Sequence, residues 1–482
     1  MFTTREARLI HELAARAAER WPDSVAIVDP GGSWTYAELN AKIMDYAAQI
    51  IGAGVRPGDR VVIRAVPERW VLATIYACAR IGAIAVPISP DLRPAEQEQI
   101  YSDAEPALVL NGPVPGSSAS VALPPSESLD PDSPVLILYT SGSTAAPKGV
   151  VCAHRSMLFA IAAIMDCLRY RSNDVVLCRV PLSFDYGLYQ SYLTALCGAA
   201  LVLSGPGNDS GLLATIRRYG VSVVPVVPTL AALLVRLAAR GTAQTVRLFT
   251  NTGEELDSAQ VGALRQAFPS AAIQLMYGTT ECKRITIAHP DSDLVRPGSV
   301  GAPLPGTSVR IVDVHDRPVP PGTEGQILVS GPHLMTGYWR DPELTSRTYR
   351  RDTLTGEHWL YTGDFGHIDD GQLHLYGRRD HLFKHRGVRT SVAEVEGAAR
   401  LVPGVSAAAL LPPGARADAV LCVVTDLAPA EVLLRLRDRL EPLKVPTSCR
   451  VLAQLPLGPN GKVDRPALAR LIDDEGGQVS YA

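Results

Sequence analysis

The sequence predicts an α/β protein: a large N-terminal domain of α/β layers with a small β-rich subdomain, followed by a small α+β C-terminal domain. Three observations predict this. Apolar strand-like runs alternate with helix-like patterns up to about residue 300, short strands and turns follow, and a compact tail mixes both patterns. The 482 residues are enough for two or more domains and a large core.

The individual elements follow in order along the chain. The run at residues 71–88 is interrupted by Arg80 and predicts a buried helix followed by a strand. Residues 111–134 are rich in Pro, Ser and Gly, which is typical of a surface connection. The remaining predictions are strands at 60–65, 135–139, 174–179, 199–203 and 221–227, a helix at 155–167, and short strands in the later runs SVRIVDV and EGQILVS.

Composition excludes several classes of function. The net charge of −3 and the lack of any Lys/Arg-rich run argue against a nucleic-acid partner. The N-terminal stretch carries acidic residues and no apolar core, so we expect no signal peptide. Arg80 interrupts the most apolar run, so we expect no membrane span there. Eight scattered cysteines without a CxxC pair predict reduced thiols and a cytoplasmic protein.

Lysine is scarce, which makes each lysine a better functional candidate than any arginine. Of 46 basic residues only six are lysine, so arginine serves wherever a surface charge is needed. A compact ammonium differs chemically from a planar guanidinium. The six are Lys42, Lys148, Lys283, Lys384, Lys444 and Lys462.

The segment YTSGSTAAPKGVV, at residues 139–151, is the most informative part of the chain. Hydroxyl residues surround a glycine, and Lys148 lies between Pro147 and Gly149. Backbone N–H groups, hydroxyls and an ammonium together suit a polyphosphate. A Walker A loop requires Ser or Thr directly after the lysine, so this is a different phosphate loop.

The order of these residues resembles the phosphate loop of the adenylate-forming superfamily, which includes acyl-CoA synthetases, nonribosomal peptide adenylation domains and luciferases. Similar motifs follow in the family's order along nearly the whole chain. They are WTYAELN, GAIAVPISP, YGTTE, YTGD, GRRDHLFKHRG and PNGKVDR. One departure is Ala145, where the family loop usually has glycine and therefore more backbone freedom.

The resemblance implies ATP and Mg²⁺ as cofactors and assigns residues to them. It gives Lys148 and Thr280 to phosphate contacts, Tyr277 to adenine stacking and Glu281 to Mg²⁺. The residues that it places around the nucleotide are Thr140, Ser141, Gly142, Ser143, Thr144, Gly253, Glu254, Tyr277, Gly278, Thr279, Asp364 and Arg378. In this set Asp364 accepts the ribose hydroxyls, and Arg378 supports the same ribose and the phosphate. The alternatives are a solvated loop acid for Glu281 and a turn-initiating residue for Asp364.

The resemblance also implies a mobile C-terminal domain. Residues 1–379 would bind ATP and the acid, Asp380 would be the hinge, and residues 380–482 would carry Lys462. Lys462 matches the lysine that neutralises charge between the carboxylate and the α-phosphate in the transition state. The alternative for Lys462 is an exposed turn lysine after Asn-Gly.

The segment PLSFDYGLYQ lies where the family builds its acid pocket. Amino-acid-activating relatives carry Phe-Asp there, so Phe184 and Asp185 match, with Asp185 accepting the substrate ammonium. A buried carboxylate without a cationic partner is costly, and an ammonium substrate would remove that cost. The alternative is Asp185 as the N-cap of a helix. The expected lining of the pocket is Tyr186, Tyr189, Pro225, Thr252, Met276, Arg284 and Ile285.

Arg284 has two interpretations, a clamp for a second substrate carboxylate or a member of an ion pair. The expected function is ATP-dependent activation of a carboxylic acid, preferably an amino acid, by a stand-alone enzyme that then loads a carrier-protein thiol. The alternatives are an acyl- or aryl-CoA ligase and an amide-forming ligase.

Overall fold

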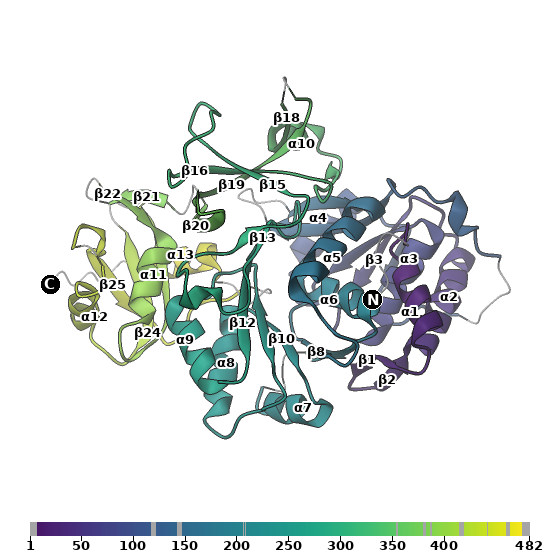
Figure 1. The fold of residues 1–482 in the computed structure, drawn as a ribbon, viewed down its shortest axis with the longest axis horizontal. Helices are drawn as coiled ribbons and strands as arrows, with labels where there is room; N and C mark the ends of the chain where they lie inside the picture. The colour runs from purple at the N-terminus through teal and green to yellow at the C-terminus, as the bar shows by residue number, and fades with distance from the viewer. Residues whose placement is uncertain are drawn as a thin grey trace. The chain divides into compact units, whose positions relative to one another are not determined.

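The computed structural model describes residues 7–116, 122–141, 147–205, 207, 209–352, 355–378, 382–385, 388–413, 419–440, 442–458 and 463–474 (Figure 1). The chain forms two compact units. One comprises Met1–Glu255, Leu264–Arg310 and Leu328–Thr362, and the other comprises Leu256–Ala263, Ile311–Ile327 and Gly363–Ala482.

A six-stranded sheet in the first unit has the order β17-β7-β6-β4-β3-β5. Its strands are β3 (Arg60–Arg64), β4 (Ile84–Ile88), β5 (Leu108–Leu110), β6 (Pro134–Ser141), β7 (Pro147–Ala153) and β17 (Gly337–Tyr338). Strands β5, β3, β4 and β6 pair in parallel, while β7 pairs antiparallel with both β6 and β17. The predicted phosphate loop therefore connects the two strands of the β6–β7 hairpin.

A nine-stranded sheet in the same unit has the order β14-β13-β12-β11-β10-β8-β9-β1-β2. Its strands are β1 (Val25–Asp29), β2 (Gly32–Thr35), β8 (Val175–Cys178), β9 (Ala200–Leu203), β10 (Val223–Val226), β11 (Leu248–Asn251), β12 (Ala272–Tyr277), β13 (Thr286–Ile287) and β14 (Ala302–Pro303). The six strands from β12 to β1 are parallel. At the edges, β2 pairs antiparallel with β1, β13 with β12 and β14 with β13. All six parallel strands therefore end at the same edge of the sheet.

Helices of the first unit pack on these sheets and on one another. They are α1 (Glu12–Arg20), α2 (Tyr36–Gly52), α3 (Arg69–Ile81), α4 (Pro94–Ala104), α5 (His154–Leu168), α6 (Asp185–Cys197), α7 (Leu212–Tyr219), α8 (Pro228–Ala238) and α10 (Pro342–Thr348), with α9 (Ser258–Ala267) crossing from one unit to the other. Helix α5 contacts β7 and α6, and α6 contacts β8 and β9, so this helix pair lies between the two sheets. One continuous apolar core includes residues of both sheets and both helices.

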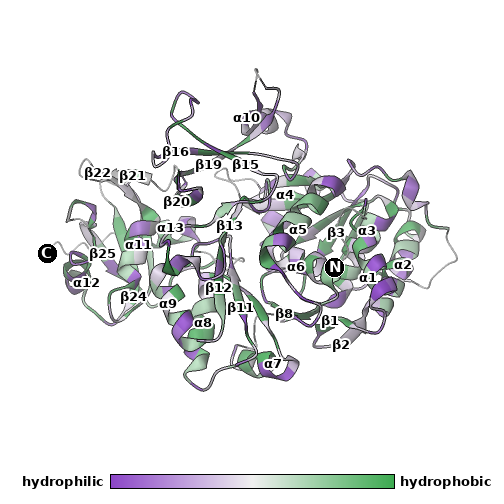
Figure 2. Ribbon diagram, in the orientation of Figure 1, coloured by the Kyte–Doolittle hydropathy of each residue, from purple (hydrophilic) through white to green (hydrophobic). Residues whose placement is uncertain are grey.

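Sequence patterning explains where these helices begin and which face they bury. Helix α2 starts at a capping box, in which the Thr35 side chain accepts from the Glu38 N–H and the Glu38 carboxylate accepts from the Thr35 N–H. Helix α1 buries Leu13, Ala14 and Ala17 and carries polar residues on its other side (Figure 2).

A five-stranded sheet contains the order β15-β16-β19-β18, with β20 also paired to β19. Its strands are β15 (Ser308–Val312), β16 (Gly325–Ser330), β18 (Tyr349–Arg351), β19 (His358–Asp369) and β20 (Gln372–Arg378). These strands correspond to the β-rich region that the sequence predicts after residue 301.

The C-terminal part of the second unit has apolar cores of its own. Its elements are β21 (Leu382–His385), β22 (Val388–Ser391), β23 (Val405–Leu411), β24 (Val420–Thr425), β25 (Ser448–Val451), α11 (Val392–Arg400), α12 (Pro429–Leu436) and α13 (Arg465–Asp474). Strands β23, β24 and β25 form one sheet, and their apolar side chains pack against α11 and α12 on one side and α13 on the other. The domain boundary at residues 379 and 380 stays a prediction.

The α/β prediction is confirmed, and the predicted strands and helices all occur within a few residues of their expected bounds. The surface connection at 111–134 includes one short 3-10 helix, Ser126–Ser128. Two further 3-10 helices in the described segments are Ser292–Leu294 and Pro442–Lys444. Within the described residues, no helix has both the length and the apolar character needed to cross a lipid bilayer. All eight cysteines are free thiols.

Candidate functional site

The predicted acid-binding residues lie close to the carboxyl ends of neighbouring parallel strands. Residues 181–185 follow β8, Thr252 follows β11, and Tyr277 ends β12. Because parallel strands end at one edge of the sheet, residues distant in the sequence meet there. Asn251 fixes the connection after β11, since its amide donates to the carbonyls of Val226 (3.1 Å) and Glu254 (3.0 Å).

Asp185 is the first residue of α6. The N-cap is Phe184, whose side chain makes no capping hydrogen bond, so the interpretation of Asp185 as the N-cap is wrong. Gly187 allows the start of α6 to approach the preceding segment, because a Cβ at that position would lie 2.4 Å from the carbonyl oxygens of Val180 and Pro181. The helix start, and with it Asp185, is therefore held close to the carboxyl end of β8.

A buried ion pair joins Asp185 to Arg284. The distance from Arg284 Nη1 to Asp185 Oδ2 is 3.0 Å, and the two side chains are 5% and 14% exposed. The guanidinium also lies over the Tyr186 ring, 5.0 Å from its centroid. The premise that the Asp185 carboxylate has no cationic partner within the chain is therefore wrong. A substrate ammonium would have to share or replace an existing contact.

Other predicted lining residues are buried beside this pair. The Tyr186 hydroxyl donates to the Thr250 carbonyl at 2.6 Å, which fixes the ring against β11. The hydroxyls of Tyr189 and Thr252 are buried and have no hydrogen-bond partner among the described residues. Burial raises the pKa of both Tyr186 and Tyr189, so their phenols stay neutral. Met276 and Ile285 are also buried, and Pro225 lies within β10.

The motif YGTTE forms the loop of the β12–β13 hairpin. Tyr277 pairs with Thr286, and the Ile285 N–H donates to the Tyr277 carbonyl at 2.8 Å. Gly278 lets the loop fold back on itself, because a Cβ there would lie 1.9 Å from the Lys283 carbonyl oxygen. The hairpin therefore carries the predicted residues Thr279, Thr280 and Glu281 and the Arg284 guanidinium on one short loop.

Glu281 is positioned by two tyrosines that sequence reasoning missed. The Tyr338 hydroxyl donates to Glu281 Oε1 at 2.7 Å, and the Tyr349 hydroxyl donates to the Glu281 carbonyl at 3.1 Å. The carboxylate is thus held by a phenol from β17 and is not a freely solvated loop acid. No sequence signal links these positions, because 57 residues separate Glu281 from Tyr338.

Lys283 is a second residue that the sequence did not assign to the site. Its side chain is fully buried, and its backbone has a φ of 69°, which is strained for a residue with a side chain. The ammonium donates to the Thr280 carbonyl at 2.9 Å and to Cys152 Sγ at 3.3 Å. It also lies over the Tyr189 ring, 5.9 Å from the centroid. The scarcity of lysine was the one signal that could have identified it.

The phosphate-loop strands are described, but most of the loop is not. Thr140 in β6 lies opposite Lys148 in β7 in the hairpin register, and both side chains are half-buried. Ser141 ends β6. The predicted residues Gly142, Ser143 and Thr144, and the departure at Ala145, lie outside the described residues, as do Asp380 and Lys462.

Asp364 and Arg378 face each other in the second unit. They are directly paired in the register of β19 and β20, with Arg378 Nε 3.5 Å from Asp364 Oδ1. Asp364 is buried within a strand, so the turn-initiating alternative is wrong. The contact of both residues with the ribose, and of Arg378 with the phosphate, stays a prediction.

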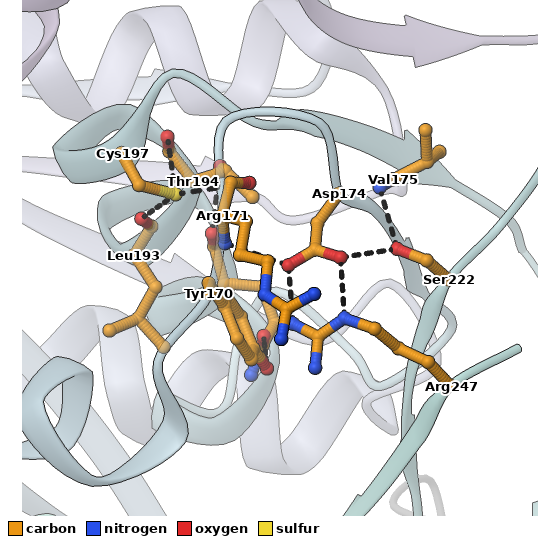
Figure 3. A network of polar contacts seen from close by, with 10 residues as sticks. Tyr170, Arg171, Asp174, Val175, Leu193, Thr194, Cys197, Ser222 and Arg247 are labelled. Carbon is orange, nitrogen blue, oxygen red and sulfur yellow. Dashed lines mark hydrogen bonds and ion pairs between the residues drawn. The ribbon is translucent and has the colours of Figure 1, made fainter. Parts of the chain in front are cut away.

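At the opposite edge of the nine-stranded sheet, a polar network fixes the amino ends of three strands (Figure 3). Asp174, just before β8, accepts from Arg247 Nε at 2.8 Å and from the Ser222 hydroxyl at 2.7 Å. Arg247 directly precedes β11 and Ser222 directly precedes β10. Burial alone would raise the pKa of Asp174, but these hydrogen bonds outweigh it and lower that pKa.

Comparison with known proteins agrees with this arrangement. The family model described as AMP-binding enzyme matches residues 14–123 and 111–339. The probable nonribosomal peptide synthetase CymA of Salinispora arenicola (strain CNS-205) is 32% identical over 95% of this chain. The chain spans only 6% of that relative's length.

Two solved structures are similar over most of their own length. VinN is 36% identical, with a TM-score of 0.69 over 77% of this chain and 98% of that chain. VinN has also been solved in complex with L-aspartate. ATP-bound MatB from Rhodopseudomonas palustris is 27% identical, with a TM-score of 0.83 over 96% of this chain and 99% of that chain. With the family model matching most of the first unit, this chain belongs to the AMP-binding, adenylate-forming enzymes, which are AMP-forming ligases.

Proposed function

We propose that this enzyme activates an amino acid as its acyl adenylate and then transfers the acyl group to the phosphopantetheine thiol of a carrier protein. In the first step a carboxylate oxygen of the substrate attacks the α-phosphorus of ATP. A P–O bond forms, the bond to the β-phosphate oxygen breaks, and pyrophosphate leaves. In the second step the thiol sulfur attacks the acyl carbon, AMP leaves and the thiol proton is released.

The partly buried carboxylate of Asp185 is the observation that supports an amino acid most strongly. It lies at the start of α6 among the predicted lining residues, and its side chain is 14% exposed. A carboxylate in such a position can accept hydrogen bonds from an ammonium, which charge assistance makes strong. The complex of VinN with L-aspartate and the similarity to a peptide synthetase support the same substrate class and a carrier-protein partner.

The other steps are proposed for residues that the resemblance assigns to ATP and Mg²⁺. Lys148 would contact the triphosphate, Asp364 the ribose, and Lys462 the charge that grows between carboxylate and α-phosphate. Glu281 would be the protein ligand of Mg²⁺, which prefers oxygen ligands and would offset phosphate charge. Within the described part of the chain no cluster of three metal-ligating side chains occurs, so this ion would take its remaining ligands from phosphate and water.

ATP–pyrophosphate exchange with Asp185 variants tests the proposal. The native enzyme should exchange pyrophosphate with an amino acid far faster than with the desamino acid of the same side chain, because only the amino acid supplies the ammonium that Asp185 is proposed to bind. Asp185→Ala should lower exchange with the amino acid by about 10²-fold or more and should narrow the difference between the two acids. Asp132→Ala, which removes an exposed carboxylate, is the matched control. If Asp185→Ala lowers the exchange rate with both acids by the same factor, Asp185 does not recognise the ammonium.

A further inference from the structure

Two buried cations, Lys283 and Arg284, lie in the cluster around Asp185. Of the two, only Arg284 is paired with the Asp185 carboxylate. The Lys283 ammonium is fully buried, and its hydrogen-bond partners, the Thr280 carbonyl and Cys152 Sγ, are both uncharged. Burial raises the pKa of the Cys152 thiol, which keeps this sulfur protonated. An isolated buried cation is unfavourable, so a second anion would stabilise the cluster.

Unpaired polar atoms occur within the same cluster and on the chain segments next to it. Arg284 Nε, the Tyr189 hydroxyl, the Thr252 hydroxyl and the Ser183 hydroxyl are buried without a hydrogen-bond partner in the part of the chain that the structure describes. Leaving a buried donor unpaired costs about 1–3 kcal/mol for each group. Most such groups in folded proteins are paired, so several together indicate a place where a polar ligand binds.

These atoms are linked to the cluster by contacts and by the chain. The Tyr189 ring lies under the Lys283 ammonium, and Ser183 is two residues before Asp185. Thr252 is two residues after Thr250, whose carbonyl accepts from the Tyr186 hydroxyl, and the Tyr186 ring stacks on Arg284. All of these atoms are donors, and a carboxylate is an acceptor that can take several hydrogen bonds at once.

We propose that Lys283 and Arg284 form a subsite for a second carboxylate, so that the substrate is a dicarboxylic amino acid. This inference rests on the proposed function, in which Asp185 binds the ammonium and another carboxylate of the substrate reacts with ATP. A monocarboxylic amino acid would bring its ammonium beside two buried cations without supplying a second carboxylate. A dicarboxylic amino acid supplies the second carboxylate itself. When it binds, Arg284 exchanges part of its contact with Asp185 for the substrate carboxylate, and the ammonium takes its place.

The charge argument separates this subsite from a purely structural role. If Lys283 only held the hairpin loop, an uncharged side chain of similar length would affect all substrates alike. If it binds a carboxylate, its removal changes the ratio between dicarboxylic and monocarboxylic substrates. A ratio measured on one preparation does not depend on how much of the protein is folded.

The test is ATP–pyrophosphate exchange on the native enzyme with five acids, L-aspartate, L-glutamate, L-alanine, β-alanine and succinate. L-Alanine and β-alanine each retain the ammonium of aspartate but lack one of its two carboxylates, and succinate lacks the ammonium. Aspartate or glutamate should exceed both monocarboxylic amino acids by about 10²-fold in kcat/KM, since buried donors that lose their acceptor discriminate strongly. L-Alanine retains the α-carboxylate of aspartate and β-alanine retains the β-carboxylate. Testing both therefore provides a monocarboxylic control whichever carboxylate of aspartate reacts with ATP.

Variants then assign the preference to residues. Lys283→Met should lower the ratio of dicarboxylic to monocarboxylic exchange by about 10-fold or more, and Lys283→Arg should restore much of it. Lys42→Met, which removes a lysine from the surface of α2, is the matched control and should leave the ratio unchanged. The subsite would be overturned if the native enzyme preferred L-alanine or β-alanine to the dicarboxylic amino acids. It would also be overturned if Lys283→Met lowered kcat/KM by the same factor with every acid. Activation of succinate but of no amino acid would instead overturn the proposed function itself.

Discussion

Arg284 Nη1 and Asp185 Oδ2 lie 3.0 Å apart although 99 residues separate them in the sequence. The first is on the β12–β13 hairpin and the second begins α6. The pair brings together the loop predicted to hold nucleotide and the helix predicted to hold the acid. The same contact reduces the cost of burying the Asp185 carboxylate before a substrate binds.

Gly278→Ala should impair adenylation, because the added methyl group would collide with the Lys283 carbonyl. The loop must shift, and a displacement of about 1 Å can cost on the order of 10²-fold in rate. ATP–pyrophosphate exchange measures the loss of activity, and circular dichroism shows whether the variant is still folded. The control is Gly262→Ala in α9, where a Cβ meets nothing within 4 Å. Equal activity of Gly278→Ala and the native enzyme would show that the tight hairpin is not needed.

Lys462→Ala should abolish most adenylate formation while ATP binding is largely retained. The predicted role of this lysine is to neutralise charge that develops in the transition state, and loss of such a group costs about 10²-fold or more. Single-turnover formation of the acyl adenylate and equilibrium ATP binding measure the two effects separately. A native rate of adenylate formation in the variant would refute this role.

His154→Gln should make the protein less sensitive to acid. Burial lowers the pKa of His154 to about 4, although the Asp130 carboxylate opposes the shift. Its Nδ1 accepts from the Ile10 N–H at 3.1 Å and so must stay unprotonated. The unfolded chain takes up this proton first, so stability present above pH 6.5 is lost as the pH falls towards 4.

Glutamine offers an acceptor that does not titrate in this range. Urea unfolding at pH 7.5 and pH 4.5 should show a smaller loss of stability in His154→Gln than in the native protein, with a difference of up to about 3 kcal/mol. The exposed His315→Gln variant should behave like the native protein. Identical losses in His154→Gln and the native protein would show that this histidine does not couple folding to pH.

Asp174→Ala should destabilise the nine-stranded sheet. The carboxylate is buried and holds Arg247 and Ser222, so its removal leaves a partly buried guanidinium without its partner. Breaking such a pair costs about 3–5 kcal/mol. The exposed pair of Asp132 and Arg155 provides the control, and Asp132→Ala should cost at most about 1 kcal/mol. Thermal unfolding followed by circular dichroism compares the two, and equal destabilisation would contradict the network's role.

Local patterns predicted the fold well, because strands and helices depend on short-range hydrophobic periodicity. The run at residues 71–88 became α3 and β4 as expected, and the apolar strand before the phosphate loop became β6. The resemblance brought Asp185, Arg284 and Glu281 into one candidate site. It could not supply the ion pair between Asp185 and Arg284, since that contact depends on how two distant segments pack.

Other parts of the site were beyond prediction for the same physical reason. Tyr338 reaches Glu281 only because β17 pairs with β7. The burial of Lys283 depends on the folding of the hairpin loop at Gly278, which composition does not reveal. The roles of Asp380 and Lys462 stay predictions.

Steady-state ATP–pyrophosphate exchange with the native enzyme, comparing L-aspartate with succinate, tests the account most directly. The two acids share a four-carbon chain and both carboxylates, and they differ only in the ammonium that Asp185 is proposed to bind. We predict a kcat/KM for L-aspartate that exceeds the value for succinate by about 10²-fold or more, because succinate lacks the ammonium that Asp185 is proposed to bind. Equal values, or a preference for succinate, would contradict the assignment of this enzyme to amino-acid activation.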